Sequence, residues 1–177
     1  MPTVCVVIVA RPNASVAPTI TALARQDRRP ERIRCGGPDE ADRLRTLGSG
    51  IPLEPATDPD PPAEEAVAFL DAGSEPAPTW LARLLGPLED RAVGFAFGPS
   101  LGSGDRPFGP VVPEEWVYRG LRTASGAHSP VHNTAWSAEL IRSAATPASA
   151  GAYDIEQLAG RALGESRTGR FVPDAVT

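Results

Sequence analysis

The stretch AVAFLDAGSEPAPTWL, residues 66–81, decides the fold class expected for this chain. It opens with a short apolar run that ends at Asp71, and glycine, serine and proline then turn the chain before Trp80. Such a run between turn residues is typical of a buried strand in a parallel sheet covered on both faces. Open α/β sheets bind ligands just beyond the carboxyl ends of their strands. Asp71 is therefore the first candidate for a functional residue, and the alternative is that it only caps the turn.

The chain before this stretch alternates between strand and helix patterns. The continuously apolar, β-branched run VCVVIVA predicts a central strand, and Val16, Ile20 and Leu23 form one apolar stripe of a helix. That alternation predicts an α/β fold with a Rossmann-like, mostly parallel sheet flanked by helices on both faces. The expected elements are a strand at Val4–Ala10, a helix from Ser15, a strand at Glu31–Cys35 and a helix that Asp39 caps.

The later part of the chain is less regular. Pro52 limits a third strand at Ile51–Glu54 to a short or edge position. The long Gly- and Pro-rich stretch Gly98–Pro130 reads as a loop, and loops of that length are usually functional or disordered. The other expected elements are an irregular connection at 55–65, a helix from about Thr79, a strand at Ala92–Phe97, a short strand or turn within His132–Arg142 that runs into a helix burying Trp136, Leu140 and Ile141, a helix that opens at Asp154, and an extended piece at Phe171 and Val172.

Length, charge and cysteine content indicate a single domain and argue against several functional classes. The 177 residues fit one domain, here residues 1–177. A net charge of −5 gives no basic face for nucleic acid or an anionic membrane. No apolar run approaches the roughly eighteen residues that cross a bilayer, so we expect no membrane span and a cytoplasmic location. Cys5 and Cys35 are too few for a disulfide framework or a zinc site, and we expect both to be free buried thiols.

Four segments, taken in order, resemble family-2 type glycosyltransferases with the GT-A, or nucleotide-diphospho-sugar transferase, fold. VVIVARPN with the helix after it is similar to the family's opening strand, turn and first helix. AFLDAGSEPAPTWLARLLGPL is similar to the strand that carries the metal-binding Asp-x-Asp and the helix that follows. HNTAWSAELI resembles the segment with Asn, a small residue and an aromatic before a helix, and YDIEQLAGRALGESRTGRFVPDAV resembles the C-terminal acidic pair, helix and strand.

The resemblance implies roles for individual residues. Asp71 matches the first Asp of Asp-x-Asp, which implies metal binding and contact with the diphosphate of the donor. Asp154 matches the second acid of the acidic pair, which implies the catalytic base that deprotonates the acceptor hydroxyl. A divalent cation, Mn²⁺ or Mg²⁺, is implied with them. The implied nucleotide-sugar-binding residues are Arg11, Pro12, Asn13, Cys35, Gly37 and Asp71, and Asn133 falls in the implied acceptor region.

The chain also departs from the family pattern. Gly73 replaces the second metal-binding Asp, which weakens cation binding, although Mg²⁺ often needs only one or two protein carboxylates beside substrate phosphates. The segment Cys35–Pro38 stands where the family has Asp-Asp-Gly-Ser, which helps to bind the base of the nucleotide. Tyr153 stands in the position of the first acid of the pair, and Glu75 is a further acid that could reach the rim of the sheet.

Several interpretations stay open at this level. Asp154 and Gln157 also fit a capping box at the start of a helix. Trp116 and Tyr118 could stack on a sugar in the acceptor region or simply pin the long loop. The leading hypothesis is a glycosyltransferase-like protein that transfers a sugar from a nucleotide-sugar to an unidentified acceptor hydroxyl. The alternative is a catalytically inactive pseudoenzyme that binds or scaffolds a protein partner; a homo-oligomer would fit either. A nucleotidyltransferase is disfavoured because no Gly-rich phosphate loop follows the first strand.

Overall fold

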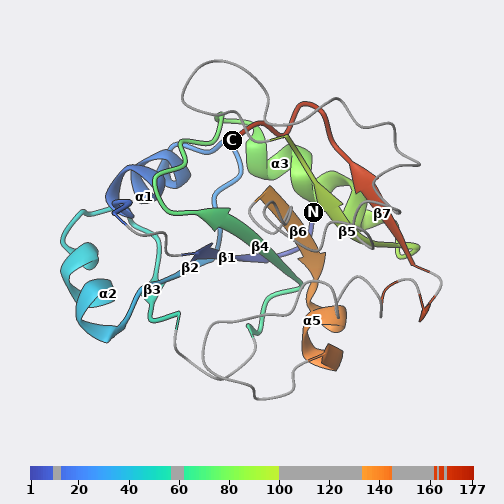
Figure 1. The fold of residues 1–177 in the computed structure, drawn as a ribbon, viewed down its shortest axis with the longest axis horizontal. Coiled ribbons are helices and arrows are strands. Elements are labelled where there is room, and N and C mark those ends of the chain that lie inside the picture. The colour runs from blue at the N-terminus through green and yellow to red at the C-terminus, as the bar shows by residue number, and fades with distance from the viewer. Residues whose placement is uncertain (10–12, 57–61, 100–132, 145–161, 163, 166) are drawn as a thin grey trace.

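The computed structural model of the chain describes residues 1–9, 13–56, 62–99, 133–144, 162, 164–165 and 167–177. Within these residues, seven strands form one sheet in the order β3-β2-β1-β4-β6-β5-β7 (Figure 1). Neighbouring strands are parallel except at β6, which runs antiparallel to both β4 and β5. The expected mostly parallel sheet is therefore confirmed. The strands are β1 (Val4–Val9), β2 (Arg32–Cys35), β3 (Leu53–Glu54), β4 (Ala66–Asp71), β5 (Val93–Phe97), β6 (Asn133–Ser137) and β7 (Thr168–Phe171).

The strands of the parallel half follow the sequence pattern closely. β4 covers the predicted apolar run and ends at Asp71, and β1 agrees with its prediction up to Val9, beyond which Ala10 lies outside the described residues. β3 is short and lies at the edge of the sheet, as Pro52 predicted. The proline has no N–H for a sheet ladder, but its carbonyl oxygen accepts a hydrogen bond of 2.9 Å from the Ile33 N–H.

The helices in the described residues begin within a few residues of their predicted positions, with one correction. Helix α2 begins at Pro38 with Gly37 as its N-cap, so the prediction that Asp39 caps it was wrong. Gly37 has the extended backbone of an N-cap, and proline is preferred at the first helical position because its missing N–H costs nothing there. The helices are α1 (Ala17–Ala24), α2 (Pro38–Arg45), α3 (Trp80–Leu85) with the 3-10 turn Gly86–Glu89 after it, and α5 (Ala138–Ala144).

The second half of the sheet differs more from the sequence-based expectation. Trp136 was expected on a helix, but it lies in β6, and only Leu140 and Ile141 are on α5. β7 begins at Thr168, earlier than the expected extended piece. Within it, Gly169 leaves room for the Phe95 ring of β5, because a Cβ at position 169 would overlap that ring. The helix expected from Asp154 lies outside the described residues, apart from Ala162 and Gly164, which are both helical.

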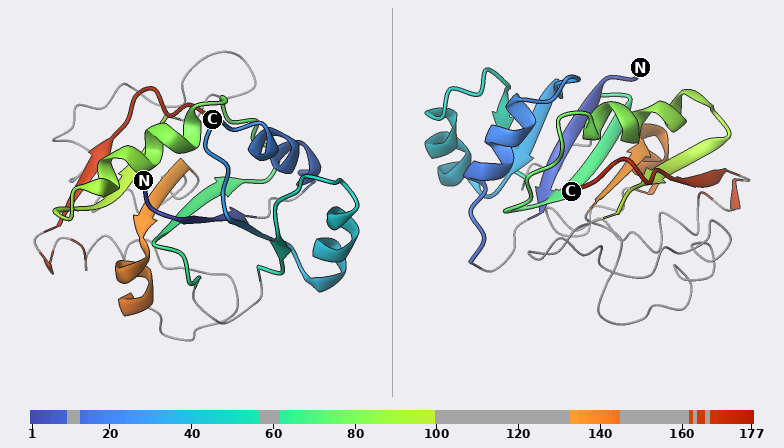
Figure 2. Two further views of the ribbon diagram at one scale, coloured as in Figure 1. Left: turned by 180° about the vertical axis from the view of Figure 1, so that it is seen from behind. Right: turned by 90° about the horizontal axis from the view of Figure 1, so that it is seen from above.

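Apolar side chains fill both faces of the sheet, and helices cover both (Figure 2). One cluster joins alternate residues of β1, β2 and β4 to the buried stripes of α1 and α3, including Trp80. The other joins the opposite residues of β1 and β4 to β5, β6 and α5. There Phe95 stacks on Trp136 with 4.5 Å between ring centroids. Because the side chains of a strand alternate, Asp71 lies on the same face as Phe69.

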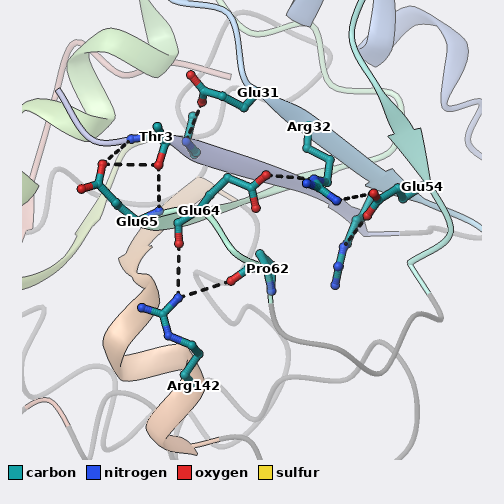
Figure 3. A network of polar contacts seen from close by, with 10 residues as sticks. Thr3, Glu31, Arg32, Glu54, Pro62, Glu64, Glu65 and Arg142 are labelled. Atoms are coloured by element: carbon teal, nitrogen blue, oxygen red, sulfur yellow. Dashed lines mark hydrogen bonds and ion pairs between the residues drawn. The ribbon is translucent and has the colours of Figure 1, made fainter.

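A polar network holds the residues that lead into β4 (Figure 3). Arg32 of β2 donates to the buried carboxylate of Glu64 at 2.8 Å and pairs with Glu54 of β3. Arg142 of α5 donates to the backbone oxygens of Pro62 and Glu64 at 3.3 and 3.4 Å. The Arg32 guanidinium offsets the desolvation cost of the Glu64 carboxylate. The network therefore ties the start of β4 to β2, β3 and α5.

The two cysteines are free and buried, as the sequence predicted. Cys5 belongs to the cluster with α5 and Cys35 to the cluster with α1, so the two thiols lie on opposite faces of the sheet. Burial raises the pKa of Cys5 to about 12 and that of Cys35 to about 11. Both thiols therefore stay protonated at neutral pH. Separately, among the described residues there is no helix with the length and apolar character needed to cross a membrane.

Candidate functional site

The carboxyl ends of β1, β2 and β4 lie side by side. At β1 the strand order reverses, because β2 lies on one side of it and β4 on the other. From β1 the chain moves through α1 to β2 on one side, and it later returns to place β4 on the other side of β1. Val9 pairs with Asp71, and Ile8 pairs with Cys35, so the three strand ends are level. Such a topological switch point is where open α/β sheets bind ligands.

Asp71 is the last residue of β4 and leads into a tight turn. The Ala72 N–H donates to the Val9 carbonyl oxygen at 2.9 Å, which extends the β1–β4 ladder by one step. The Ser74 N–H then donates to the Asp71 carbonyl oxygen at 3.2 Å, and Gly73 between them has a φ of 87°. The side chain of Asp71 is half-buried at this turn. The sequence-predicted carboxylate therefore does lie at the rim of the sheet, beside the switch point.

The connection from β1 to α1 reaches the same place. Asn13 is exposed and has a φ of 65°, a left-handed conformation that asparagine tolerates better than most residues. Its neighbour Ala14 lies against Gly73, since a Cβ built on Gly73 would be 3.6 Å from the Ala14 Cβ. The structure thus brings the segment with Asn13 next to the Asp71 turn. The other two residues predicted here, Arg11 and Pro12, lie outside the described residues.

At the end of β2, the predicted residues Cys35 and Gly37 can offer the candidate site only backbone groups, not side chains. The Cys35 side chain is fully buried in an apolar cluster, and Gly37 begins α2. Sequence reasoning missed Glu40, whose carboxylate lies over Gly36, so that a Cβ at position 36 would overlap it. The signal was available: Glu40 stands three residues after the N-cap, where a glutamate reaches back toward the helix start. After burial, the charge of Glu40 is the next cause of the raised pKa of Cys35.

Asn133 lies at the start of β6, opposite Leu70. Its side chain is buried, and its Oδ1 accepts a hydrogen bond of 2.6 Å from the Trp80 indole N–H. Its Nδ2 donates to the backbone oxygens of Pro99 and Ala175, both at 2.8 Å. The amide therefore joins α3, the end of β5 and the C-terminal residues beside the strand that carries Asp71. Its assignment to an acceptor region remains a prediction.

Besides Arg11 and Pro12, three further predicted residues lie outside the part of the chain that the structure describes. They are the candidate base Asp154 and the aromatic residues Trp116 and Tyr118. Their roles stay predictions from the sequence.

The donor set at the Asp71 turn fits a cation that arrives with a diphosphate, but not one that the protein holds alone. Within the described ranges, no group of three or more His, Cys, Asp or Glu residues is arranged so that it could hold a metal ion. The turn supplies one hard carboxylate, Asp71, and the left-handed backbone of Gly73 disfavours a second side chain. Mg²⁺ commonly takes one or two carboxylates and completes its coordination with water and substrate phosphates.

No protein-family model matches the chain, and no curated protein does either. Solved structures do match its fold. A mannosyltransferase from Pyrobaculum calidifontis, in complex with GDP-Man and Mn²⁺, superposes with a TM-score of 0.64 at 18% identity over 99% of this chain and 56% of the mannosyltransferase. The chain thus spans little more than half the length of that enzyme.

Two mycobacterial structures give a similar result. Glucosyl-3-phosphoglycerate synthase from Mycobacterium tuberculosis, in complex with Mn²⁺, UDP and phosphoglyceric acid, has a TM-score of 0.61 at 16% identity over 99% of this chain and 69% of the synthase. A further mycobacterial protein has a TM-score of 0.64 at 17% identity over 99% of this chain and 66% of that protein. Likeness at this level of identity shows a shared fold, and the chain therefore has the GT-A fold that the sequence predicted.

Proposed function

We propose that this chain is a glycosyltransferase domain that moves a sugar from a nucleotide-sugar donor to an acceptor hydroxyl. The observation that carries the proposal is the position of Asp71, at the carboxyl end of β4 and paired with Val9 at the switch point of a GT-A fold. Two proteins of the same fold were solved with GDP-Man or UDP and with Mn²⁺. The fold therefore supports a nucleotide-sugar as the ligand, and Asp71 is placed where a carboxylate could bind the cation of its diphosphate.

Each residue has a limited role in the proposed reaction. Asp71 would hold a divalent cation that enters with the diphosphate, and such a cation stabilises the charge of a diphosphate leaving group. The backbone at Asn13 and Gly37 would line the nucleotide side of the site, where the strand ends meet. Asp154 would take the proton of the acceptor hydroxyl, because a hydroxyl is a poor nucleophile until a base removes its proton. Support for Asp154 comes from the sequence resemblance alone.

Nucleotide binding tests the proposal most directly. The melting temperature of the purified protein is measured with UDP, GDP, dTDP and their sugars, with and without Mn²⁺ or Mg²⁺, because a ligand of the folded state raises it by mass action. We expect a cation-dependent rise with one nucleotide, lost in Asp71→Asn. The matched control is Asp42→Asn on the exposed side of α2, which should keep the rise. No rise with any nucleotide at millimolar concentration would contradict the proposal.

Transfer itself is tested with the same variants once the donor is known. The rate of sugar hydrolysis or transfer is measured as the release of the nucleoside diphosphate. Asp71→Ala and Asp154→Ala should each reduce this rate. If both variants keep the wild-type rate, the assignment of these two residues is wrong.

A specific observation favours a second candidate, a pseudoenzyme of this fold that binds a partner. Gly73 stands where the resembling family has its second metal-binding Asp, and its φ of 87° suits glycine rather than aspartate. On this proposal the nucleotide site has lost its catalytic role, and protein binding remains. Turnover of any nucleotide-sugar by the purified chain would contradict it.

A further inference from the structure

We infer that Thr19 of α1 is a positioning residue for the Asp71 carboxylate, an inference that rests on the proposed nucleotide-sugar site. Thr19 lies in the first turn of α1 and is fully buried. Its Oγ1 accepts a hydrogen bond of 3.0 Å from the Gly73 N–H, two residues after Asp71. The bond joins the turn after β4 to the helix that follows β1. The two segments that flank the switch point are therefore connected through one side chain.

The chain that connects β4 to α3 is also hydrogen-bonded at its other end, to a residue just after α1. Gln26, just beyond the helix, is buried; its Nε2 donates to the Ala77 carbonyl oxygen at 2.8 Å, and its Oε1 accepts from the Leu81 N–H at 3.0 Å. Because Gln26 fixes the entry to α3, the chain between β4 and α3 has few remaining degrees of freedom. The remaining conformational freedom lies in the turn after Asp71, and the hydrogen bond to the Thr19 hydroxyl restricts that turn.

The Thr19 hydroxyl and the Gln26 amide differ in what their loss would do. The bond from the Gly73 N–H to Thr19 is only partly buried and Gly73 itself is exposed, so a small shift of the turn lets water reach the N–H when the hydroxyl is removed, and the cost in folding stability is small. Removal of the Gln26 amide instead leaves the buried Leu81 N–H without its acceptor, which destabilises the fold. Loss of the Thr19 hydroxyl should therefore loosen the Asp71 turn in a protein that still folds, and the effect should appear in ligand affinity.

The test uses three threonine variants of the full chain. Thr19→Val keeps the shape of the side chain and removes the hydroxyl, and Thr19→Ser keeps the hydroxyl. Thr21→Val is the matched control, because Thr21 is exposed on the same helix and its hydroxyl donates to the Ala17 carbonyl oxygen at 3.0 Å. Affinity for GDP, UDP and dTDP in the presence of Mn²⁺ is measured by calorimetry. Exchange of the Gly73 amide hydrogen is followed by NMR, and the melting temperature is recorded for each variant.

We expect Thr19→Val to lower nucleotide affinity by about three- to tenfold, the range that one lost hydrogen bond allows. Its Gly73 amide should exchange faster, while its melting temperature stays near that of the wild type. Thr19→Ser and Thr21→Val should match the wild type in affinity. Wild-type affinity in Thr19→Val, or a failure of Thr19→Ser to retain affinity, would overturn the inference and leave the proposed function in place. If the wild-type protein binds none of GDP, UDP and dTDP, the proposed function fails, and the role of Thr19 in ligand binding fails with it.

Discussion

The Trp80 indole N–H donates a hydrogen bond of 2.6 Å to the Oδ1 of Asn133, which lies 53 residues further along the chain. This bond joins the start of α3 to the start of β6, directly beside the end of β4. The same amide donates to the backbone oxygens of Pro99 and Ala175. One buried side chain thus connects four segments next to the candidate site, and the cost of its removal can be measured.

Asn133→Ala should lower the free energy of unfolding by about 2–4 kcal/mol, because a buried indole N–H and two carbonyl oxygens lose their partner together. Urea unfolding checks this, with exposed Thr21→Ala on α1 as the control that should change stability by less than about 0.5 kcal/mol. If Asn133→Ala lowers the free energy of unfolding by less than about 1 kcal/mol, water replaces the amide at this junction and the prediction is wrong.

Gly98 should tolerate alanine less well than Gly86. A Cβ on Gly98 would overlap the Ala175 carbonyl oxygen and approach the Asn133 Nδ2 at 2.8 Å, so Gly98→Ala should destabilise the fold by about 1–3 kcal/mol. Gly86 has no distant atom within 4 Å of an added Cβ, but its helical backbone stands before Pro87, where a Cβ is disfavoured, so Gly86→Ala should cost less than Gly98→Ala without stabilising the fold. Both changes are read from urea midpoints, and a stable Gly98→Ala variant would contradict the close approach of the C-terminal residues.

Restoring an aspartate at position 73 should not create a cation site. Gly73→Asp forces a side chain into a left-handed backbone with φ of 87°, which should cost about 1 kcal/mol of folding stability. The added Cβ would point at Ala14, whereas Asp71 lies on the opposite face of β4. Binding of Mn²⁺ in the absence of nucleotide, followed by electron paramagnetic resonance, should therefore stay as weak as in the wild type. Gly73→Asn, with the same shape and no charge, is the control, and tight Mn²⁺ binding by Gly73→Asp alone would show this argument to be wrong.

Glu31 should make folding stability depend on pH in the acid range. Burial acts to raise the pKa of this carboxyl, but the Val4 N–H at 2.7 Å and the Arg28 guanidinium outweigh it, and the pKa lies below its usual value. A carboxyl with a lowered pKa in the folded state adds stability above its unfolded pKa of about 4.3 and loses it as the pH falls through the folded pKa. Because the side chain is partly exposed, the effect should be small and should shrink in high salt.

Glu31→Gln tests this effect, because the amide oxygen can still accept from the Val4 N–H while the charge is gone. Urea unfolding between pH 3 and pH 7 should show wild type more stable than the variant near pH 6, and the difference should disappear toward pH 3. A difference that is constant across this range would contradict the role of the Glu31 charge.

The sequence by itself determined the elements whose signals are local. The apolar runs of β1 and β4, the position of Asp71 at a strand end, the buried stripe of α1 and the short edge strand after Pro52 were all predicted, because each depends on periodicity or on one proline.

Tertiary structure alone decided the rest. The insertion of β6 antiparallel between β4 and β5 depends on pairing with strands far away in the chain, and Trp136 was placed on the wrong element for that reason. The three partners of Asn133, the carboxylate of Glu40 over Gly36 and the hydrogen bond from Gly73 to Thr19 are also unpredictable from local pattern. Backbone propensity and hydrophobic period describe neighbours along the chain, whereas these contacts form only when the sheet brings distant segments together.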